Sequence, residues 1–243
     1  MRLSVEGLTV RFGAVAALNR VSLQVSSGER LAVIGPNGAG KTTLFNVIAG
    51  DLPAAAGSVS FDGREVTRLA SWRRARLGLG RTFQRSTLFG QLTVAENLAL
   101  AVRTRLRGGW RFWPSRRERV VEAEVAQRLR AGGLETVAQR PALALAHGEQ
   151  RSLEVELALA AGPRALLLDE PMAGLAGPER QAAVERLRAL PREVTLVIVE
   201  HDLDAVFALA ERIAVLDHGV VIADGPPEQV RSDARVQEVY LGA

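Results

Sequence analysis

A glycine-rich segment directly after a short apolar run constrains the fold more than any other feature of this chain. Residues 35–43 read Gly-Pro-Asn-Gly-Ala-Gly-Lys-Thr-Thr, which fits the phosphate-loop pattern GxxxxGK[ST]. The preceding run, 30–34, predicts a buried strand, and the stretch that follows, 42–49, predicts a helix. Together with later apolar runs that also precede helical stretches, this order predicts an α/β fold built on a parallel sheet.

The residue types in this loop suit a nucleotide-phosphate site. Glycines let successive backbone N–H groups converge on phosphate oxygens, and the start of the helix adds positive potential. Lys41 is the only lysine in the chain, and we expect it to reach the β- and γ-phosphates, while the Thr42 hydroxyl binds Mg²⁺. A glycine-rich turn that happens to precede a helix is the alternative, but such a turn needs no lysine at this position. The predicted nucleotide-binding residues are Gly35, Pro36, Asn37, Gly38, Ala39, Gly40, Lys41, Thr42 and Thr43.

Two adjacent carboxylates end a second apolar run. Residues 165–171 read Ala-Leu-Leu-Leu-Asp-Glu-Pro, which predicts a buried strand with Asp169 and Glu170 at its carboxyl end. Parallel sheets collect their ligands at that edge. Asp169 is the predicted Mg²⁺ partner, and Glu170 is expected to hold and polarise the water that attacks the γ-phosphate. A solvated strand end is the alternative, and the phosphate loop upstream favours the functional interpretation.

Two further polar residues follow β-like segments. His201 comes after the apolar run 194–199, where an imidazole is able to reach the γ-phosphate; a surface or helix-capping histidine is the alternative. Gln84, in Arg-Thr-Phe-Gln, offers an amide oxygen to the metal and the attacking water. The predicted catalytic residues are Glu170, His201, Gln84 and Lys41, and the predicted metal-binding residues are Thr42, Gln84 and Asp169.

These motifs, in this order, resemble the nucleotide-binding domain of ABC transporters over essentially the whole chain. Residues 145–149, followed by a helical stretch, are similar to the family's signature motif, usually written LSGGQ, which separates ABC proteins from other P-loop enzymes. The resemblance implies that Phe12 stacks on adenine, that Gln84 is the Q-loop glutamine and that His201 is the switch histidine. It also implies that the signature of one subunit closes over the ATP held by another subunit. The signature residues are Leu145, Ala146, His147, Gly148 and Glu149.

Membership of this family implies a P-loop NTPase with a parallel-sheet core, an N-terminal antiparallel β subdomain and a helical lobe. The expected organisation is a single domain over 1–243, with the helical lobe at about 85–160 inserted in the RecA-like core. Two residues depart from the family pattern. Ala146 lacks the hydroxyl of the usual serine, which puts the strength of the contact with the second ATP in doubt. Ala176 stands where many relatives have Asp or Asn, which puts the coupling between the two sites in doubt.

Composition narrows the possible partners. The absence of cysteine excludes disulfides, thiolate zinc sites and cysteine nucleophiles. With no apolar run of about 18 residues and no leader-like N-terminus, we expect neither a membrane span nor a secretion signal.

Residues 101–120 hold seven arginines against one glutamate, beside Trp110, Phe112 and Trp113. The resemblance places this cluster near the membrane subunits and anionic lipid; a nucleic-acid contact and a solvated loop are the alternatives.

Five shorter strings are most similar to ATPases of branched-chain amino-acid uptake systems. They are Gly80-Arg-Thr-Phe-Gln84, Leu-Thr-Val-Ala-Glu-Asn97, Leu-Ala-His-Gly-Glu-Gln150, Val-Glu-His-Asp202 and Val-Tyr-Leu-Gly242. This resemblance implies an ATP- and Mg²⁺-dependent motor subunit, peripheral on the cytoplasmic face of the inner membrane. The implied partners are two multi-span permeases, a second identical or related ABC ATPase and, indirectly, an extracytoplasmic solute-binding protein, without nucleic acid.

Other functions stay open from the sequence. Relatives handle urea, short amides or lipopolysaccharide export, and no residue of the chain identifies the solute. A soluble ABC ATPase of DNA repair or translation usually has two cassettes or a long coiled coil, and 243 residues without a heptad run leave room for neither. A P-loop kinase for a small acceptor would not need the signature motif.

Overall fold

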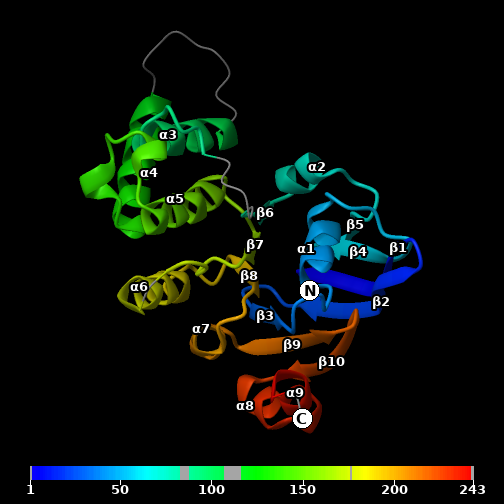
Figure 1. Cartoon of the computed structure of the whole chain (residues 1–243). Coiled ribbons are helices and arrows are strands. Elements are labelled where there is room, and N and C mark those ends of the chain that lie inside the picture. Colours follow the sequence, from blue (N-terminus) through cyan, green and yellow to red (C-terminus); the bar gives the residue numbers. More distant parts are fainter. Residues whose placement is uncertain (1, 83–87, 107–115, 176, 242–243) are drawn as a thin grey trace. The chain divides into compact units, whose positions relative to one another are not determined.

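The computed structural model describes residues 2–82, 88–106, 116–175 and 177–241, which form two compact units (Figure 1). Unit 1 contains residues 1–81, 164–170 and 190–243, and unit 2 contains residues 82–163 and 171–189. Unit 2 therefore takes a second segment, 171–189, beyond the helical lobe expected at about 85–160. Among the helices that the structure describes, none is long and apolar enough to cross a bilayer.

The core of unit 1 is a six-stranded sheet in the order β10-β9-β3-β8-β7-β6. All neighbouring strands are parallel except β10, which runs antiparallel to β9. Val199 pairs with both Val33 and Asp169, so β3, β7 and β8 end at the same edge of the sheet. The strands are β3 (Arg30–Ile34), β6 (Leu79–Arg81), β7 (Ala165–Asp169), β8 (Thr195–Val199), β9 (Arg212–Asp217) and β10 (Val220–Gly225).

A second sheet in unit 1 is antiparallel, in the order β2-β1-β4-β5, which matches the β subdomain that the resemblance implies. Its longer strands have buried and exposed residues in partial alternation, as a sheet with one face against the core requires. Strand β2 begins at Val15 because it pairs with β1 down to the turn, where Phe12 lies opposite Val15. The strands are β1 (Leu3–Phe12), β2 (Val15–Val25), β4 (Ala56–Phe61) and β5 (Arg64–Glu65).

Helices pack against these sheets through two apolar clusters. Phe45 and Ile48 of α1 are fully buried in a cluster shared with the antiparallel sheet. The C-terminal helices bring Val230 and Val236 against Ile34 and the inner residues of β9. The helices of unit 1 are α1 (Lys41–Ala49), α2 (Ser71–Arg76), α7 (Leu203–Leu209), α8 (Pro227–Ser232) and α9 (Ala234–Leu241).

A buried arginine fixes α2 against α1. Arg74 is 2% exposed, and its guanidinium donates to the carbonyl oxygens of Val47 (2.7 Å) and Ile48 (2.6 Å) at the end of α1. It also donates to the carbonyls of Leu69 and Thr67, both at 2.9 Å. Burial lowers the pKa of Arg74, and the charge of Asp51 opposes that shift. Arg74 thus adds a charged donor to carbonyls at the end of α1, where the backbone donors of the helix run out.

We expect Arg74→Ala to lower the free energy of unfolding by about 3 kcal/mol, because buried carbonyls lose a charged donor. Urea unfolding followed by circular dichroism measures the change. Arg73→Ala is the matched control: Arg73 is the neighbouring residue but exposed, so its removal is expected to cost less than about 0.5 kcal/mol. Equal losses for the two variants would contradict an anchoring role for Arg74.

The described residues of unit 2 form four α-helices and two short 3-10 helices. A capping box starts α3: the Thr93 hydroxyl accepts from the Glu96 N–H (3.1 Å), and the Glu96 carboxylate accepts from the Thr93 N–H (2.8 Å). The apolar cluster of this unit includes Leu98, Val102 and Leu153. The elements are α3 (Val94–Arg105), α4 (Arg116–Gly132), α5 (His147–Ala160), α6 (Gly177–Arg188), Glu135–Val137 and Ala142–Ala144.

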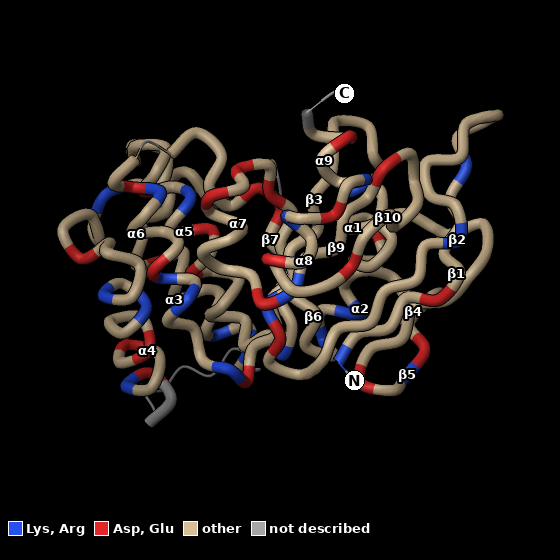
Figure 2. Tube along the Cα trace, turned by 90° about the horizontal axis from the view of Figure 1, so that it is seen from below, with Lys and Arg blue, Asp and Glu red and all other residues tan. Residues whose placement is uncertain are grey.

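The arginine-rich segment 101–120 is described only in part. Arg103 pairs with Glu118, and Arg105 pairs with Glu124. Charges of both signs follow one another along α4, as Figure 2 shows. Residues 107–115, with the three aromatic residues of this segment, lie outside the described residues. Its contact with lipid, permease or nucleic acid therefore stays a prediction.

Candidate functional site

The phosphate loop joins β3 to α1 at the shared edge of the parallel sheet. Gly35 and Gly40 have φ angles of 148° and 105°, a region that favours glycine. A Cβ on Gly35 would collide with the Leu216 carbonyl oxygen, and one on Gly40 would lie 2.5 Å from the Ala17 carbonyl oxygen. The pattern of glycines that predicted the loop is thus required by close backbone packing on two sides.

Lys41 is held inside the loop. Its ammonium donates to the carbonyl oxygens of Gly35 (2.6 Å) and Pro36 (2.9 Å), and the residue is 8% exposed. Burial lowers the pKa of Lys41, whereas the charges of Glu170 and Asp169 act in the opposite direction. The ammonium is therefore positioned where it can exchange loop carbonyls for phosphate oxygens, which are stronger charged acceptors.

Asp169 ends β7 and is fully buried, with a partner that the sequence did not suggest. The Arg81 guanidinium lies 3.2 Å from the Asp169 carboxylate and also donates to Asn46 (2.7 Å) and Asp51 (2.9 Å). Arg81 ends β6, next to β7 in the sheet. Its charge offsets part of the cost of burying the Asp169 carboxylate. A short β-like stretch before Gln84 was the only sequence signal for this arginine.

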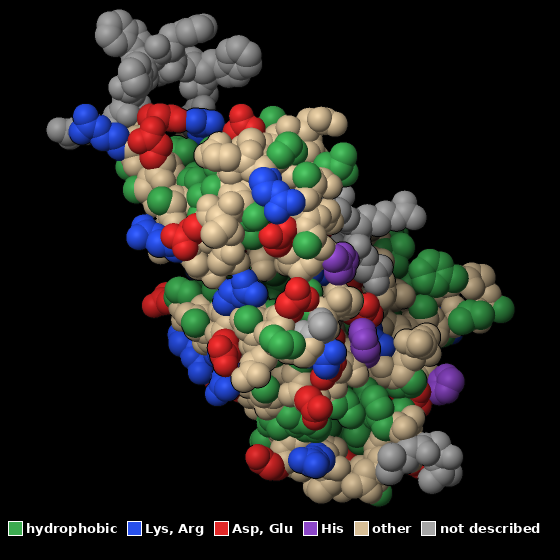
Figure 3. All heavy atoms as spheres, turned by 60° about the vertical axis from the view of Figure 1, so that its left-hand side comes forward, with side chains coloured by type: hydrophobic (Ala, Val, Ile, Leu, Met, Phe, Trp, Pro, Cys, Tyr) green, Lys and Arg blue, Asp and Glu red, His purple; other side chains and the backbone are tan. Residues whose placement is uncertain are grey.

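Glu170 and His201 lie close together beyond the strand ends. Glu170 has a φ of 48°, unusual for a residue other than glycine, and its backbone N–H donates to the Val199 carbonyl (2.9 Å). The His201 Nδ1 lies 3.9 Å from the Glu170 carboxylate, and the imidazole is 63% exposed. All three histidines of the chain are exposed, and imidazoles are visible on the face in Figure 3. The structure therefore brings two of the predicted catalytic side chains together beside the phosphate loop.

Phe12 lies at the turn between β1 and β2, where it pairs with Val15. Both side chains are exposed, Phe12 by 54%. The same hairpin approaches the phosphate loop through Ala17, whose carbonyl limits the space at Gly40. An exposed aromatic ring on a hairpin that contacts the loop is available to stack on a base, as the resemblance implies for Phe12.

The C-terminal helix contributes a residue that the sequence analysis did not single out as part of the site. Tyr240 of α9 packs on the apolar cluster that contains Ile34, the last residue before the phosphate loop. Burial raises the pKa of the Tyr240 hydroxyl to about 12, and the backbone of Gly35 acts in the opposite direction. Tyr240 therefore packs the C-terminal helix against the strand that leads into the loop.

The signature residues form the start of α5 in unit 2. Leu145 is buried, Ala146 is the N-cap, and the helix begins at His147. The Glu149 carboxylate accepts a hydrogen bond from the Ala146 N–H (2.8 Å). Ala146 has no hydroxyl that could accept the second hydrogen bond of a capping box from the Glu149 N–H. The exposed His147 imidazole lies 3.3 Å from the Ala173 carbonyl. The free N–H groups of this helix start remain available to a ligand.

We expect Ala146→Ser to stabilise the protein by about 1 kcal/mol, because a serine N-cap completes the capping box with Glu149. Thermal unfolding should show a Tm higher by about 2–4 °C. Ala123→Ser, on the exposed side of α4, introduces the same change inside a helix and should give no gain. A Tm that stays unchanged in the N-cap variant would count against this account of the helix start.

The donor set at the strand edge suits Mg²⁺. The Thr42 hydroxyl is on the exposed side of α1, and Asp169 supplies a carboxylate nearby at the sheet edge. Mg²⁺ prefers oxygen ligands and is usually held by one or two protein groups together with nucleotide phosphates. Among the described residues, no cluster of three or more His, Asp or Glu side chains is placed to hold a metal ion. Gln84 and Ala176 lie outside the described residues.

The sequence matches two family profiles. The profile described as ABC transporter matches residues 18–173, and the profile described as branched-chain amino acid ATP-binding cassette transporter matches residues 220–243. The chain is 39% identical to the high-affinity branched-chain amino acid transport ATP-binding protein BraF of Pseudomonas aeruginosa, over 99% of this chain and 97% of that protein. It is also 39% identical to LivG of Escherichia coli, a protein of the same description, with the same coverage.

Solved structures agree with the sequence matches. A crystal structure of an ATP-binding cassette of an ABC transporter in its ADP conformation has a TM-score of 0.84 and 32% identity, covering 100% of this chain and 99% of that one. A nucleotide-free cassette has a TM-score of 0.83 and 31% identity, with the same coverage.

Proposed function

Because the chain belongs to the ABC transporter family, we propose that it is the ATP-hydrolysing motor subunit of an importer for branched-chain amino acids. The chain is an ATPase with the fold of an ATP-binding cassette. The observation that carries the proposal is similarity at 39% identity, over nearly the full length, to two proteins described as high-affinity branched-chain amino acid transport ATP-binding proteins. The separate match of the C-terminal 24 residues, 220–243, supports the same subfamily.

The site suggests how this chain hydrolyses ATP. The phosphate loop and Lys41 bind the phosphates, and Phe12 stacks on the adenine. Thr42, Asp169 and Gln84 would hold Mg²⁺, which neutralises phosphate charge when bound. Glu170 orients a water molecule and accepts its proton as the water oxygen bonds to the γ-phosphorus and the bond to ADP breaks. Lys41 and His201 stabilise the negative charge on the transferred group.

The two units act together as one cassette that works in pairs. The signature residues 145–149 of one cassette close over the ATP bound to the phosphate loop of another, so ATP bridges the pair. Hydrolysis removes the bridge, and the pair reopens. The second cassette is either a copy of this chain or a related ATPase. The cassettes act on the cytoplasmic face of the inner membrane with two multi-span permeases and an extracytoplasmic solute-binding protein.

The test is to isolate the transporter with this chain tagged, in mild detergent, and to identify its partners by mass spectrometry. Two permeases and a second cassette are expected. The reconstituted complex should hydrolyse ATP faster when its binding protein is loaded with leucine, isoleucine or valine, and not when urea or a short amide is added. If only urea stimulated ATP hydrolysis, urea would be the transported solute instead of a branched-chain amino acid. If the tagged chain were recovered with only ribosomal or nucleic-acid partners, the proposed transport function would be wrong.

A further inference from the structure

An exposed tryptophan on α2 contacts two arginines of the same helix, outside the nucleotide site. Trp72 is 52% exposed. The Arg73 guanidinium lies 5.0 Å from the centroid of the indole ring, and the Arg76 guanidinium lies 4.9 Å from it. Both distances are within the range of a cation–π interaction. The indole therefore holds two positive charges together at the surface of unit 1.

One more arginine, Arg64, extends this patch, and Arg68 is close to it in sequence. Arg64 and Arg68 are exposed, and an open hollow is lined by Arg64, Leu69, Trp72, Arg73, Arg76 and Leu77. In the described part of the chain, no carboxylate forms an ion pair with Arg64, Arg68, Arg73 or Arg76, although the exposed Glu65 is adjacent in sequence to the first of them. Several other exposed arginines do pair with a carboxylate, for example Arg192 with Glu211 and Arg235 with Asp233.

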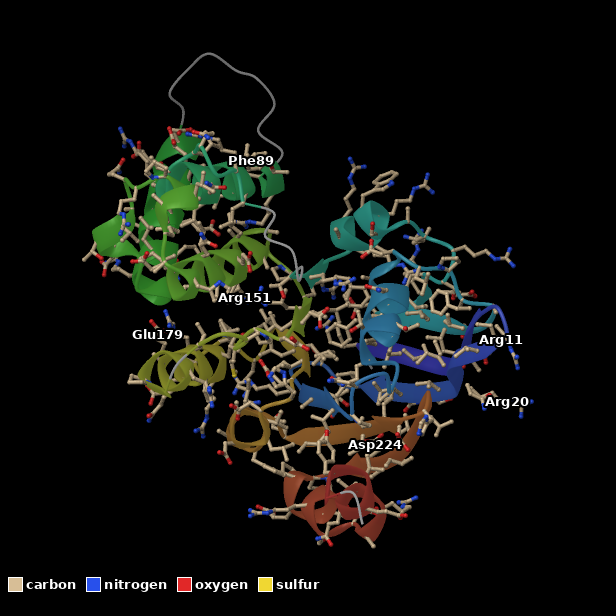
Figure 4. All side chains as sticks on the ribbon, viewed as in Figure 1. Arg11, Arg20, Phe89, Arg151, Glu179 and Asp224 are labelled. Carbon is tan, nitrogen blue, oxygen red and sulfur yellow. The ribbon has the colours of Figure 1, made fainter. Side chains whose placement is uncertain are left out.

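The buried Arg74 explains why this patch faces outward. Arg74 is on the inner side of α2, where four backbone carbonyls hold it. Trp72, Arg73 and Arg76 must then occupy the remaining, solvent-facing side of this short helix. Side chains of α2 project away from the sheets in Figure 4. The orientation of the patch is thus fixed by the fold and does not depend on a flexible tail.

We propose that this α2 patch, defined by Arg64, Trp72, Arg73 and Arg76, binds the headgroups of anionic phospholipids. Arginine pairs with phosphate through two parallel N–H groups, and clustered basic residues are attracted to an anionic leaflet. The indole favours a membrane surface over an acidic peptide, because tryptophan is enriched at headgroup level, where its ring is partly wet and partly apolar. The inference extends the proposed function, since it gives the membrane-bound cassette a lipid contact of its own.

Tryptophan fluorescence tests this contact at the residue concerned. The chain has three tryptophans, so Trp110→Phe/Trp113→Phe leaves Trp72 as the only one. Vesicles of phosphatidylcholine with phosphatidylglycerol should shift the Trp72 emission to shorter wavelength, and brominated lipid should quench it. Vesicles of phosphatidylcholine alone should do neither. Binding of a fluorescent ATP analogue to the same protein shows independently whether the nucleotide site, and hence the proposed function, holds.

Matched arginine variants in the protein with Trp72 as its only tryptophan complete the test. Arg73→Ser/Arg76→Ser should weaken binding to the anionic vesicles about 30-fold, because each arginine near such a surface contributes roughly a factor of five. Arg192→Ser/Arg235→Ser removes two exposed charges elsewhere and should weaken it much less. No spectral change in a protein that binds ATP, or the same change with neutral vesicles, would overturn the inference. Unaltered vesicle binding by Arg73→Ser/Arg76→Ser with loss of the permeases would identify a protein contact instead.

Discussion

We expect Glu170→Gln to bind ATP normally but to hydrolyse it at least about 100-fold more slowly than the unaltered chain. Glutamine has nearly the same size, so the left-handed backbone at this position and the contact with Val199 should be retained. Its neutral amide cannot accept the proton of the attacking water. Phosphate release at saturating ATP and Mg²⁺ measures the rate, and light scattering should show a pair of cassettes that stays closed.

Glu193→Gln is the control for this variant. Glu193 is exposed in the loop before β8. Its replacement by glutamine is the same chemical change, made at a residue that has no role in the proposed chemistry. Its hydrolysis rate should match that of the unaltered chain. Rapid hydrolysis by Glu170→Gln would mean that another group handles the water, and the assignment of Glu170 would be wrong.

For Lys41→Met we expect nucleotide affinity to fall by about ten- to a hundredfold, because one charged donor to the phosphates is lost. Methionine keeps the apolar stem of this buried side chain, so the loop should retain its shape. Titration with a fluorescent ATP analogue measures the affinity, and thermal unfolding shows whether the variant is folded. Because Lys41 is the only lysine, the substitution leaves the chain without an ammonium side chain.

Arg192→Met provides the comparison for Lys41→Met. It also replaces one cation by methionine, at a surface position paired with Glu211. Its nucleotide affinity should stay within about twofold of the unaltered value, since exposed ion pairs contribute little. If both variants bound ATP equally well, the phosphate loop would not be the nucleotide site.

The elements around the nucleotide site were predictable because their signals are local. The strand 30–34 and the helix 42–49 were expected within one residue of their observed bounds. The carboxylates and the histidine also follow strands as expected. Periodicity, glycine spacing and helix caps depend on neighbouring residues, so a single sequence displays them directly.

The partners of buried charges could not be predicted in the same way. Arg81 meets Asp169, 88 positions later in the chain, and Arg74 meets the end of α1. Nothing near either arginine in sequence distinguishes it from the many exposed arginines. Only the strand order, which places β6 beside β7, and the packing of α2 on α1 create these contacts.

The sequence by itself determined the kind of chemistry this protein performs, since glycines, one lysine and two carboxylates at fixed spacings define a phosphate site. The tertiary structure decided which charges are buried together, which arginines face solvent beside Trp72, and that Tyr240 packs against the cluster that contains Ile34. The physical reason is the separation along the chain over which each interaction acts. Backbone conformation and hydrophobic periodicity act over a few residues, whereas desolvation and ion pairing act between groups that only the folded chain brings within a few ångströms.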